Sequence, residues 1–147
     1  MRRDSANGMQ LKAVLAAVSV ADNTAQVGSI IDIQGFTRLT YAIQIGAVAD
    51  ADATFAVLLE ESNNADMSGA NTVADGDMIS ETVGVAPLTA AGFKFDSDGQ
   101  VRKLGYRGSK RYTRLTVTPA NNAGAAAFAA MAILDGANNA PVVQAVS

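Results

Sequence analysis

Cysteine, histidine and tryptophan are all missing from this sequence of 147 residues. Without His and Cys, the usual transition-metal ligands and the usual nucleophile–base pairs are excluded. A catalytic site would have to be built from carboxylates, Lys, Tyr or Ser alone, and the fold cannot rely on disulfides. We therefore expect a protein without metal or other cofactor, and not an enzyme.

Long hydrophobic runs are missing as well. No stretch approaches the roughly 20 apolar residues that a membrane span needs. Arg2 and Arg3, followed by the apolar segment 11–20, imitate a signal peptide, but Asp4 and Lys12 interrupt that pattern. The sequence predicts a soluble protein that is made in a cytoplasm and makes no membrane contact.

Acidic residues are absent from one long window, between Gln100 and Leu134. Six of the eleven Lys and Arg residues lie within residues 102–114 of this window, although the formal net charge is -3. The chain thus carries one local basic stretch on an otherwise acidic body. A stretch of this kind points to a surface that contacts something, which favours a binding or assembly module.

Alternation of apolar and polar residues is the dominant pattern of the chain, and polar turn-forming clusters separate the alternating segments. It predicts an all-β domain, an antiparallel β-sandwich or jelly-roll of about eight short strands. Pro119 is expected to end the strand before it. The predicted strands lie near residues 11–20, 28–33, 37–47, 53–62, 76–81, 92–95, 100–106 and 111–118, with a ninth near 125–134.

Two alanine-rich segments, 11–21 and 123–134, are compatible with either strand or helix, because Ala favours helix and their larger residues fit neither period cleanly. We favour strand for the second, because it follows an Asn-Asn-Ala-Gly turn. The sandwich is expected to span residues 11–135. Residues 1–10 are interpreted as a flexible arm and residues 136–147 as an extended tail that packs on its own sheet or on a partner.

The basic stretch is predicted to form a hairpin, with strands 100–106 and 111–118 joined by a turn at 107–110. Three interpretations remain open: a charged, solvated sheet face, a protein-facing surface rich in Arg and Tyr, or a nucleic-acid contact. The acidic body argues against nucleic acid, because net repulsion opposes long-range attraction. The predicted protein-interface residues are Arg102, Lys103, Tyr106, Arg107, Lys110, Arg111, Tyr112 and Arg114.

Other patterns of chemical interest are explained more simply as turns. Asp96-Ser97-Asp98-Gly99 resembles the start of a calcium loop, but the downstream bidentate Glu is absent. The scattered carboxylates could include a glycosidase pair, but spacing alone does not bring two of them together. The segment 105–110 does not match a phosphate-binding loop. None of these supports an active site or a metal site.

The basic stretch 102–119, the Ala/Gly-rich strand after it and the closing Ala140-Pro141-Val142 together resemble small tailed-bacteriophage virion structural proteins. The earlier segment Phe55–Ser62, followed by Asn63-Asn64, fits the same pattern, so the resemblance spans most of residues 30–143. A weaker similarity is to discoidin-like jelly-roll modules that bind sugars, through the Glu61-Ser62 turn and the late segment 111–115. The disulfide pair and exposed aromatic loops of those modules are missing here.

The phage resemblance implies a capsid decoration, or cement, protein on the surface of the virion head. Its partners would be the major capsid protein and further copies of itself, as a dimer or trimer. The alternatives are a carbohydrate-binding sandwich on the virion and a structural protein of the tail or neck.

Overall fold

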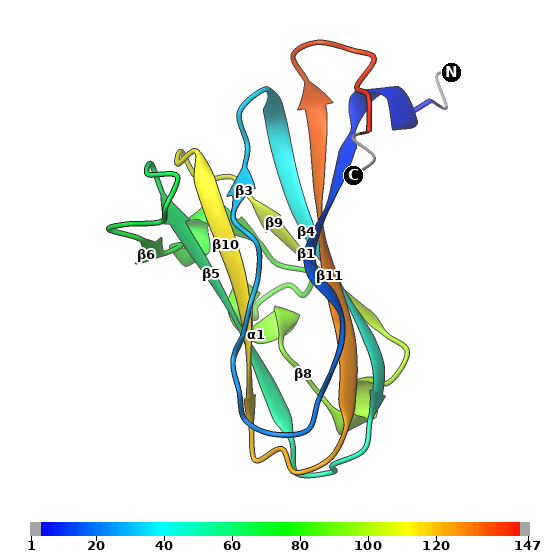
Figure 1. Ribbon diagram of the computed structural model, residues 1–147. Helices are drawn as coiled ribbons and strands as arrows, with labels where there is room; N and C mark the ends of the chain where they lie inside the picture. Colours follow the sequence, from blue (N-terminus) through cyan, green and yellow to red (C-terminus); the bar gives the residue numbers. More distant parts are fainter. Residues whose placement is uncertain (1–3, 145–147) are drawn as a thin grey trace.

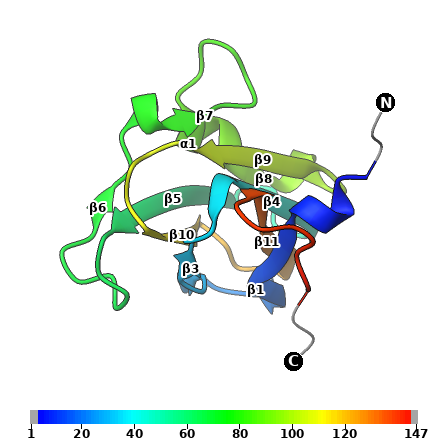
Figure 2. The same cartoon turned by 90° about the horizontal axis from the view of Figure 1, so that it is seen from above.

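Two antiparallel sheets lie face to face in the computed structural model, which describes residues 4–144 (Figures 1 and 2). Within these residues the chain forms eleven strands and one short α-helix. The predicted all-β sandwich is therefore confirmed. In spatial order, sheet A consists of β1 (Gln10–Val20), β11 (Ala126–Ala137), β4 (Phe36–Val48), β9 (Val101–Tyr106) and β7 (Met78–Ile79).

Sheet B is built around two long strands, and short strands pair with their flanks. The central strand β10 contacts β5 over its whole length, from the pair Tyr112–Ser62 to the pair Ala120–Thr54. The strands of sheet B are β2 (Gln26–Val27), β3 (Ile31–Asp32), β10 (Tyr112–Ala120), β5 (Thr54–Ser62), β6 (Asn71–Thr72) and β8 (Phe93–Lys94).

The core forms where the alternating strands turn their apolar side chains toward the opposite sheet. Phe55 and Phe93 of sheet B stack at 4.7 Å between ring centroids, and Phe128 of sheet A meets both rings edge-on. Higher in the sandwich, the hydroxyl groups of Tyr41 and Thr113 lie 2.6 Å apart and join the two sheets. Burial raises the pKa of Tyr41, so this hydroxyl stays neutral.

Short irregular elements close the sides of the sandwich. The amides of Gly28 and Ser29 donate to carbonyls of Leu115 in sheet B and Val14 in sheet A. A Cβ atom at Gly28 would lie 2.5 Å from the Leu115 oxygen, so only glycine permits this close approach. On the opposite side, the helix α1 (Pro87–Ala91) packs against β5 and β9. Three 3-10 turns complete the described chain: η1 (Ala6–Gly8), η2 (Asp75–Asp77) and η3 (Phe95–Ser97).

Several details of the sequence prediction are wrong. The strands β9 and β10 do not form a hairpin, because β9 pairs in sheet A and β10 in sheet B. The five residues between them are enough to cross from one layer to the other, about 10 Å away. Of the predicted strand 28–33, only β3 is a strand, and Gly28 and Ser29 instead bridge the two sheets. The helix α1 was not predicted.

Pro119 does not end its strand, since it lies within β10 opposite Phe55. The carbonyl of Leu115 accepts a hydrogen bond from Gly28, on the side of β10 where β2 lies. Backbone groups of residues two apart in a strand face the same side, so the nitrogen of Pro119 also faces the β2 side. The pairing with β2 ends at Val117. The missing N–H of proline therefore falls at an open edge, where it breaks no hydrogen bond.

The described parts of the two predicted terminal segments lie against sheet A. Residue 10 already belongs to β1, and β11 continues to residue 137. Beyond β11, the amide of Val142 donates to the carbonyl of Asn7, and the side chain of Gln144 bonds both the amide and the carbonyl of Leu11. Residues 1–3 of the predicted arm and 145–147 of the predicted tail lie outside the described residues.

Candidate functional site

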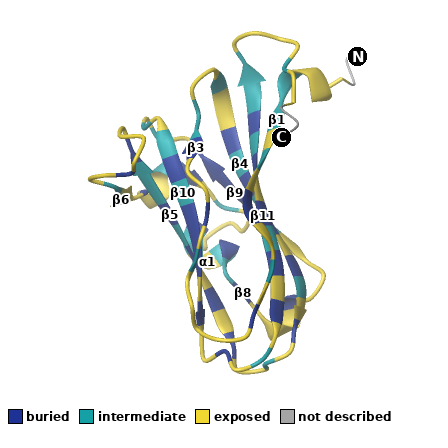
Figure 3. Cartoon of the chain, viewed as in Figure 1, coloured by how far each residue is buried: buried dark blue, intermediate teal, exposed yellow. Residues whose placement is uncertain are grey.

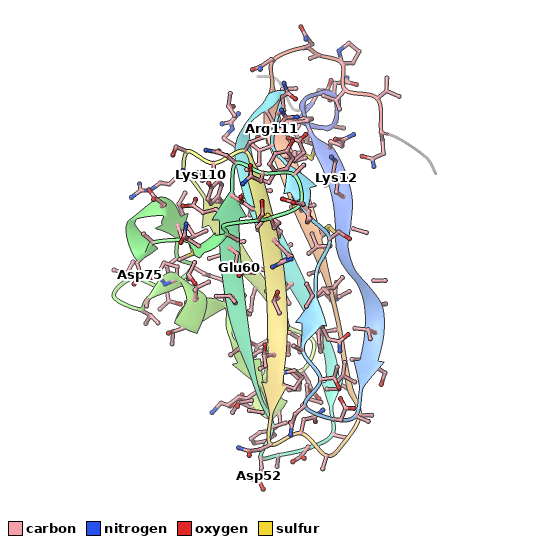
Figure 4. All side chains as sticks on the ribbon, turned by 60° about the vertical axis from the view of Figure 1, so that its left-hand side comes forward. Lys12, Asp52, Glu60, Asp75, Lys110 and Arg111 are labelled. Carbon is pink, nitrogen blue, oxygen red and sulfur yellow. The ribbon has the colours of Figure 1, made fainter. Side chains whose placement is uncertain are left out.

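The basic stretch 102–114 is divided between the two sheets. Arg102 and Lys103 belong to β9 in sheet A, and Arg114 belongs to β10 in sheet B. Residues 107–111 form the crossing between them. Figure 4 places Lys110 and Arg111 at one end of the sandwich, far from Asp52 at the other. The predicted interface residues therefore do not share one face.

Tyr106 holds the crossing in place. Its hydroxyl donates a hydrogen bond to a carboxylate oxygen of Glu61 at 2.7 Å and accepts one from the amide of Lys110 at 3.0 Å. Burial raises the pKa of Tyr106, and the hydrogen bond to Glu61 raises it further. Gly108 passes so close that a Cβ atom there would lie 2.6 Å from the Tyr106 ring. Tyr106 is 6% exposed, so it acts within the fold and offers no open ring.

Two of the arginines are paired with carboxylates of sheet B. The Arg111 guanidinium binds Asp32 through two nitrogens, at 2.9 and 2.8 Å, and Arg114 binds Glu60 at 2.9 Å. The hydrogen bonds from Arg111 hold the pKa of Asp32 below its usual range. Arg111 also lies over the ring of Tyr112, with 4.9 Å between the guanidinium carbon and the ring centroid. These cations are largely neutralised within their own sheet.

The remaining four cations differ in how they are held. Arg102 donates to the side chains of Gln100 and Ser97, and Arg107 donates to the carbonyl of Gly76 at 2.9 Å. Within residues 4–144, the ammonium groups of Lys103 and Lys110 make no hydrogen bond or ion pair. Lys103 lies on the outside of sheet A and Lys110 lies in the crossing, so these two are the free cations of the stretch.

The outer face of sheet A is apolar and uncovered by the described chain. Strand pairing brings Ala13, Met131, Ala42 and Lys103 into one row across four strands. Met131 is 43% exposed, and Figure 3 shows exposed positions along the strands of this layer. A shallow hollow of about 710 Å³ follows the rows. We refer to its lining as the outer face of sheet A, namely Leu11, Lys12, Ala13, Leu15, Ala16, Ala17, Ala42, Gln44, Val101, Ala129, Ala130 and Met131.

The chemistry of this outer face is simple. None of the lining residues is aromatic, and the one charged residue among them, Lys12, pairs with the buried Ala132, so its side chain points toward Asp32 on the other side of the sheet. A second hollow of about 350 Å³ continues it toward Ala127 and Gly46. Small side chains leave a smooth surface that suits close packing against another surface rather than the grip of a small ligand.

From Ala126 to Leu134 the strand β11 is apolar on both sides. Phe128 and Leu134 point into the sandwich and are buried, while Ala127, Ala129 and Met131 alternate with them on the outside. Alternation of this kind between two apolar sets is typical of strands that are covered on both faces. The run from Ala125 to Leu134 contains no polar residue at all. Strand β11 therefore has the sequence of a strand in a buried layer, with one side left open.

This outer face was missed at the level of sequence, although its signal was present. The predicted ambiguity of the alanine-rich segments came from these same alternating alanines. A strand with two apolar faces has no period of two in hydrophobicity, so it resembles a helix by composition. The informative sign was the unbroken apolar run from Ala125 to Leu134, which a strand covered on both faces would show.

A polar hollow of about 430 Å³ lies on the side where β8 and η3 meet the end of β9. Arg102 and Gln100 lie in its wall and hydrogen-bond each other at 2.6 Å. Phe93 also lines it but is only 5% exposed.

Neither a metal group nor a membrane helix appears in the part of the chain that the structure describes. No three carboxylate-bearing residues lie together there as metal ligands would. No helix within residues 4–144 has the length and apolar character to cross a membrane.

No protein-family model and no curated protein matches the chain. Among solved structures, it is similar to a family two carbohydrate esterase from Cellvibrio japonicus, with 11% identity and a TM-score of 0.43 over 95% of this chain. It is also similar to the N-terminal CBM22-1–GH10 modules of Clostridium thermocellum xylanase 10B in complex with xylohexaose, with 13% identity and a TM-score of 0.44 over 97% of this chain. The chain spans 33% and 28% of the length of those two proteins.

Proposed function

We propose that this chain is a non-enzymatic structural protein of a phage virion. We further propose that it decorates the capsid, lying on the outer shell across the joints between capsomers. The observation that carries the proposal is the outer face of sheet A, which has the composition of a covered layer. The sequence resemblance to tailed-phage virion proteins supplies the partner, a viral shell.

The physical basis of such a role is differential binding. A module that contacts two neighbouring subunits binds the assembled shell and not the free subunits, so it stabilises the shell by mass action. An apolar centre with a polar rim is the usual anatomy of a protein interface. Met131 and Val101 would lie at that centre, and Lys103 at its rim. Self-association as a dimer or trimer would add avidity to each contact.

The direct test mixes the purified protein with capsids that lack it. We expect saturable co-sedimentation at a fixed number of copies per capsomer, added density across capsomer joints, and capsids that resist heating better. Free capsid subunits serve as the control and should bind weakly. Absence of binding to the shell, or equal binding to free subunits, would contradict the proposal.

A second candidate function is a carbohydrate-binding module on the virion, and it depends on the polar hollow around Arg102. Hydroxyl-rich ligands suit such a wall of hydrogen-bonding side chains. The described walls offer little ring surface for stacking, because Phe93 is buried there. A glycan array with the isolated protein tests this function, with Arg102→Ala as the matched variant. Binding that Arg102→Ala removes would support it, and a silent array would dismiss it.

A further inference from the structure

Sheet A has an empty strand position at the end of β9. The pairing of β4 with β9 stops at Leu39 and Tyr106. The next residue, Arg107, faces β7 and donates its amide to the carbonyl of Asp77, and the chain then crosses to sheet B. Strand β4 nevertheless continues to Phe36, and among residues 4–144 it pairs there only with β11. The edge of residues 36–38 is therefore open on the side that β9 has left.

The backbone of Thr37 faces this open edge. On the side of β4 where β9 lies, the amide of Ile45 donates to the carbonyl of Gln100, and the carbonyl of Ile45 accepts from the amide of Gly99. Backbone groups of an antiparallel strand alternate in direction, so those of Thr37 point to the same side as those of Ile45. An unpaired amide and carbonyl of this kind form a template for another extended chain.

The empty position is a groove with a positive wall. It has a volume of about 350 Å³, and its lining includes three cations and no carboxylate. Arg38 is the only one of the three with an ion pair among the described residues, to Asp135 at 3.4 Å, and its side chain remains 70% exposed. The cations are Arg38, Arg107 and Lys110.

Apolar side chains supply the rest of the wall. Ile33 and Phe36 line it from the start of β4, and Ile79, which is 56% exposed, lines it from β7. A partner with alternating side chains would place one set on these apolar groups and the other near the cations. Positive charge in a protein of net charge -3 selects acidic partners at this one location.

We propose that this groove binds an extended acidic segment of a partner protein, which adds as a short strand to the free edge of β4. Strand addition obtains its affinity from backbone hydrogen bonds and its specificity from alternate side chains. Single-stranded nucleic acid fits less well, because it cannot pair as a strand with the backbone of Thr37, and because Tyr106 is buried and leaves Phe36 as the one ring of the lining on which a base could stack. The inference deepens the proposed assembly role and rests on it only for the identity of the partner. It uses no residue of the outer face of sheet A as defined above.

The experiment uses the full chain, labelled with 15N, and a five-residue peptide, acetyl-Glu-Val-Glu-Val-Glu-amide. We expect saturable shifts of the amide signals of residues 37–38, Ile79 and 107–110, which weaken as salt is added. Three further probes are titrated in the same way: the Gln-Val counterpart, an N-methylated Glu-Val peptide, and an eight-nucleotide oligo(dT). Each should bind at least about tenfold more weakly. The Gln-Val peptide lacks the charge, the N-methylated peptide lacks the strand hydrogen bonds, and oligo(dT) lacks the side-chain pattern.

The variant pair isolates the groove from general charge. Arg107→Gln with Lys110→Gln should weaken the peptide about tenfold, as two partly exposed ion pairs would. The control is Lys94→Gln with Lys103→Gln, which removes the same charge outside the groove and should leave affinity unchanged. Shifts located elsewhere, equal binding of the N-methylated peptide, or tighter binding of oligo(dT) would overturn the proposal. Because no capsid is used, failure here leaves the shell-binding test intact.

Discussion

The two outer faces of the sandwich differ sharply in chemistry. The outer face of sheet A presents alanines with Met131 at its centre, and its charged groups, Lys103 and the Arg38–Asp135 pair, lie around that centre. The outer face of sheet B carries the ion pair between Arg114 and Glu60 in the middle of its two long strands. Charge that is paired within its own sheet suits water, whereas an apolar centre gains by being covered. The less conspicuous face is therefore the better candidate for a partner.

The strands at the centre of each sheet show the same difference. Along β10, buried Leu115 and Val117 alternate with outward-facing Arg114 and Thr118. Along β11, the outward residues from Ala127 to Ile133 are apolar like the inward ones, and Asp135 follows only near the end of the strand. The comparison predicts that a charge is tolerated on the outside of sheet B and is costly on the outside of sheet A once a partner covers it.

The largest expected effect comes from a charge at the centre of the outer face of sheet A. Met131→Glu should leave the fold intact and weaken capsid binding at least about 100-fold, because an unpaired carboxylate would be buried at the interface. The measurement is co-sedimentation with capsids. Thr118→Glu on the outside of sheet B is the matched control, and equal losses in the two variants would erase the distinction between the faces.

The second effect concerns the crossing that separates the two faces. Gly108→Ala should lower the free energy of unfolding by about 1–3 kcal/mol, since the new methyl group overpacks the ring of Tyr106. Urea denaturation followed by circular dichroism measures it. Gly76→Ala, where a Cβ atom meets nothing within 4 Å, is the control and should change little. A neutral Gly108→Ala would mean that the crossing is looser than described.

A third, smaller effect tests whether Arg114 and Glu60 on sheet B neutralise each other. A double-mutant cycle with Glu60→Gln and Arg114→Gln should give a coupling of about 0.2–1 kcal/mol that falls as salt is added. Urea denaturation of the four proteins provides the values. A coupling of zero at low salt would show that this pair does not neutralise the face.

The smallest effect is a dependence of stability on pH that arises from Asp32 in sheet B. Because the pKa of Asp32 is lowered in the fold, its contribution to stability is present above the unfolded carboxyl pKa of about 3.9. The contribution is lost as pH falls through the lower, folded value. The melting temperature of Asp32→Asn should therefore lie below that of the natural chain at pH 6 and approach it at pH 2.5. Parallel curves at all pH values would rule out this linkage.

Much of the fold was predictable from local sequence. The long strands β4, β5 and β10 follow from alternation, which a half-buried sheet imposes directly. The layer to which each strand belongs was not predictable, because β9 and β10 alternate in the same way whether they pair or face each other. The helix α1 is too short for periodicity to reveal.

The candidate site was predictable in part by residue type and not by placement. The partners of the basic stretch lie far away in sequence: Glu61 is 45 residues from Tyr106, Glu60 is 54 from Arg114, and Asp32 is 79 from Arg111. Whether a cation is free or paired depends on such distant contacts. The groove beside Thr37 depends on where one strand pairing ends, which has no signature in the residues themselves.

Met131 provides the most direct test of the central claim, that the outer face of sheet A is covered in the assembly. Its sulfur lies on that face, whereas Met67 and Met78 are 5% and 4% exposed and serve as internal references. Exposed methionine is oxidised to the sulfoxide far more readily than buried methionine, and mass spectrometry counts the product. Brief peroxide treatment should oxidise Met131 in the free protein and spare it in the capsid-bound protein. Equal oxidation of Met131 in both states would contradict the account.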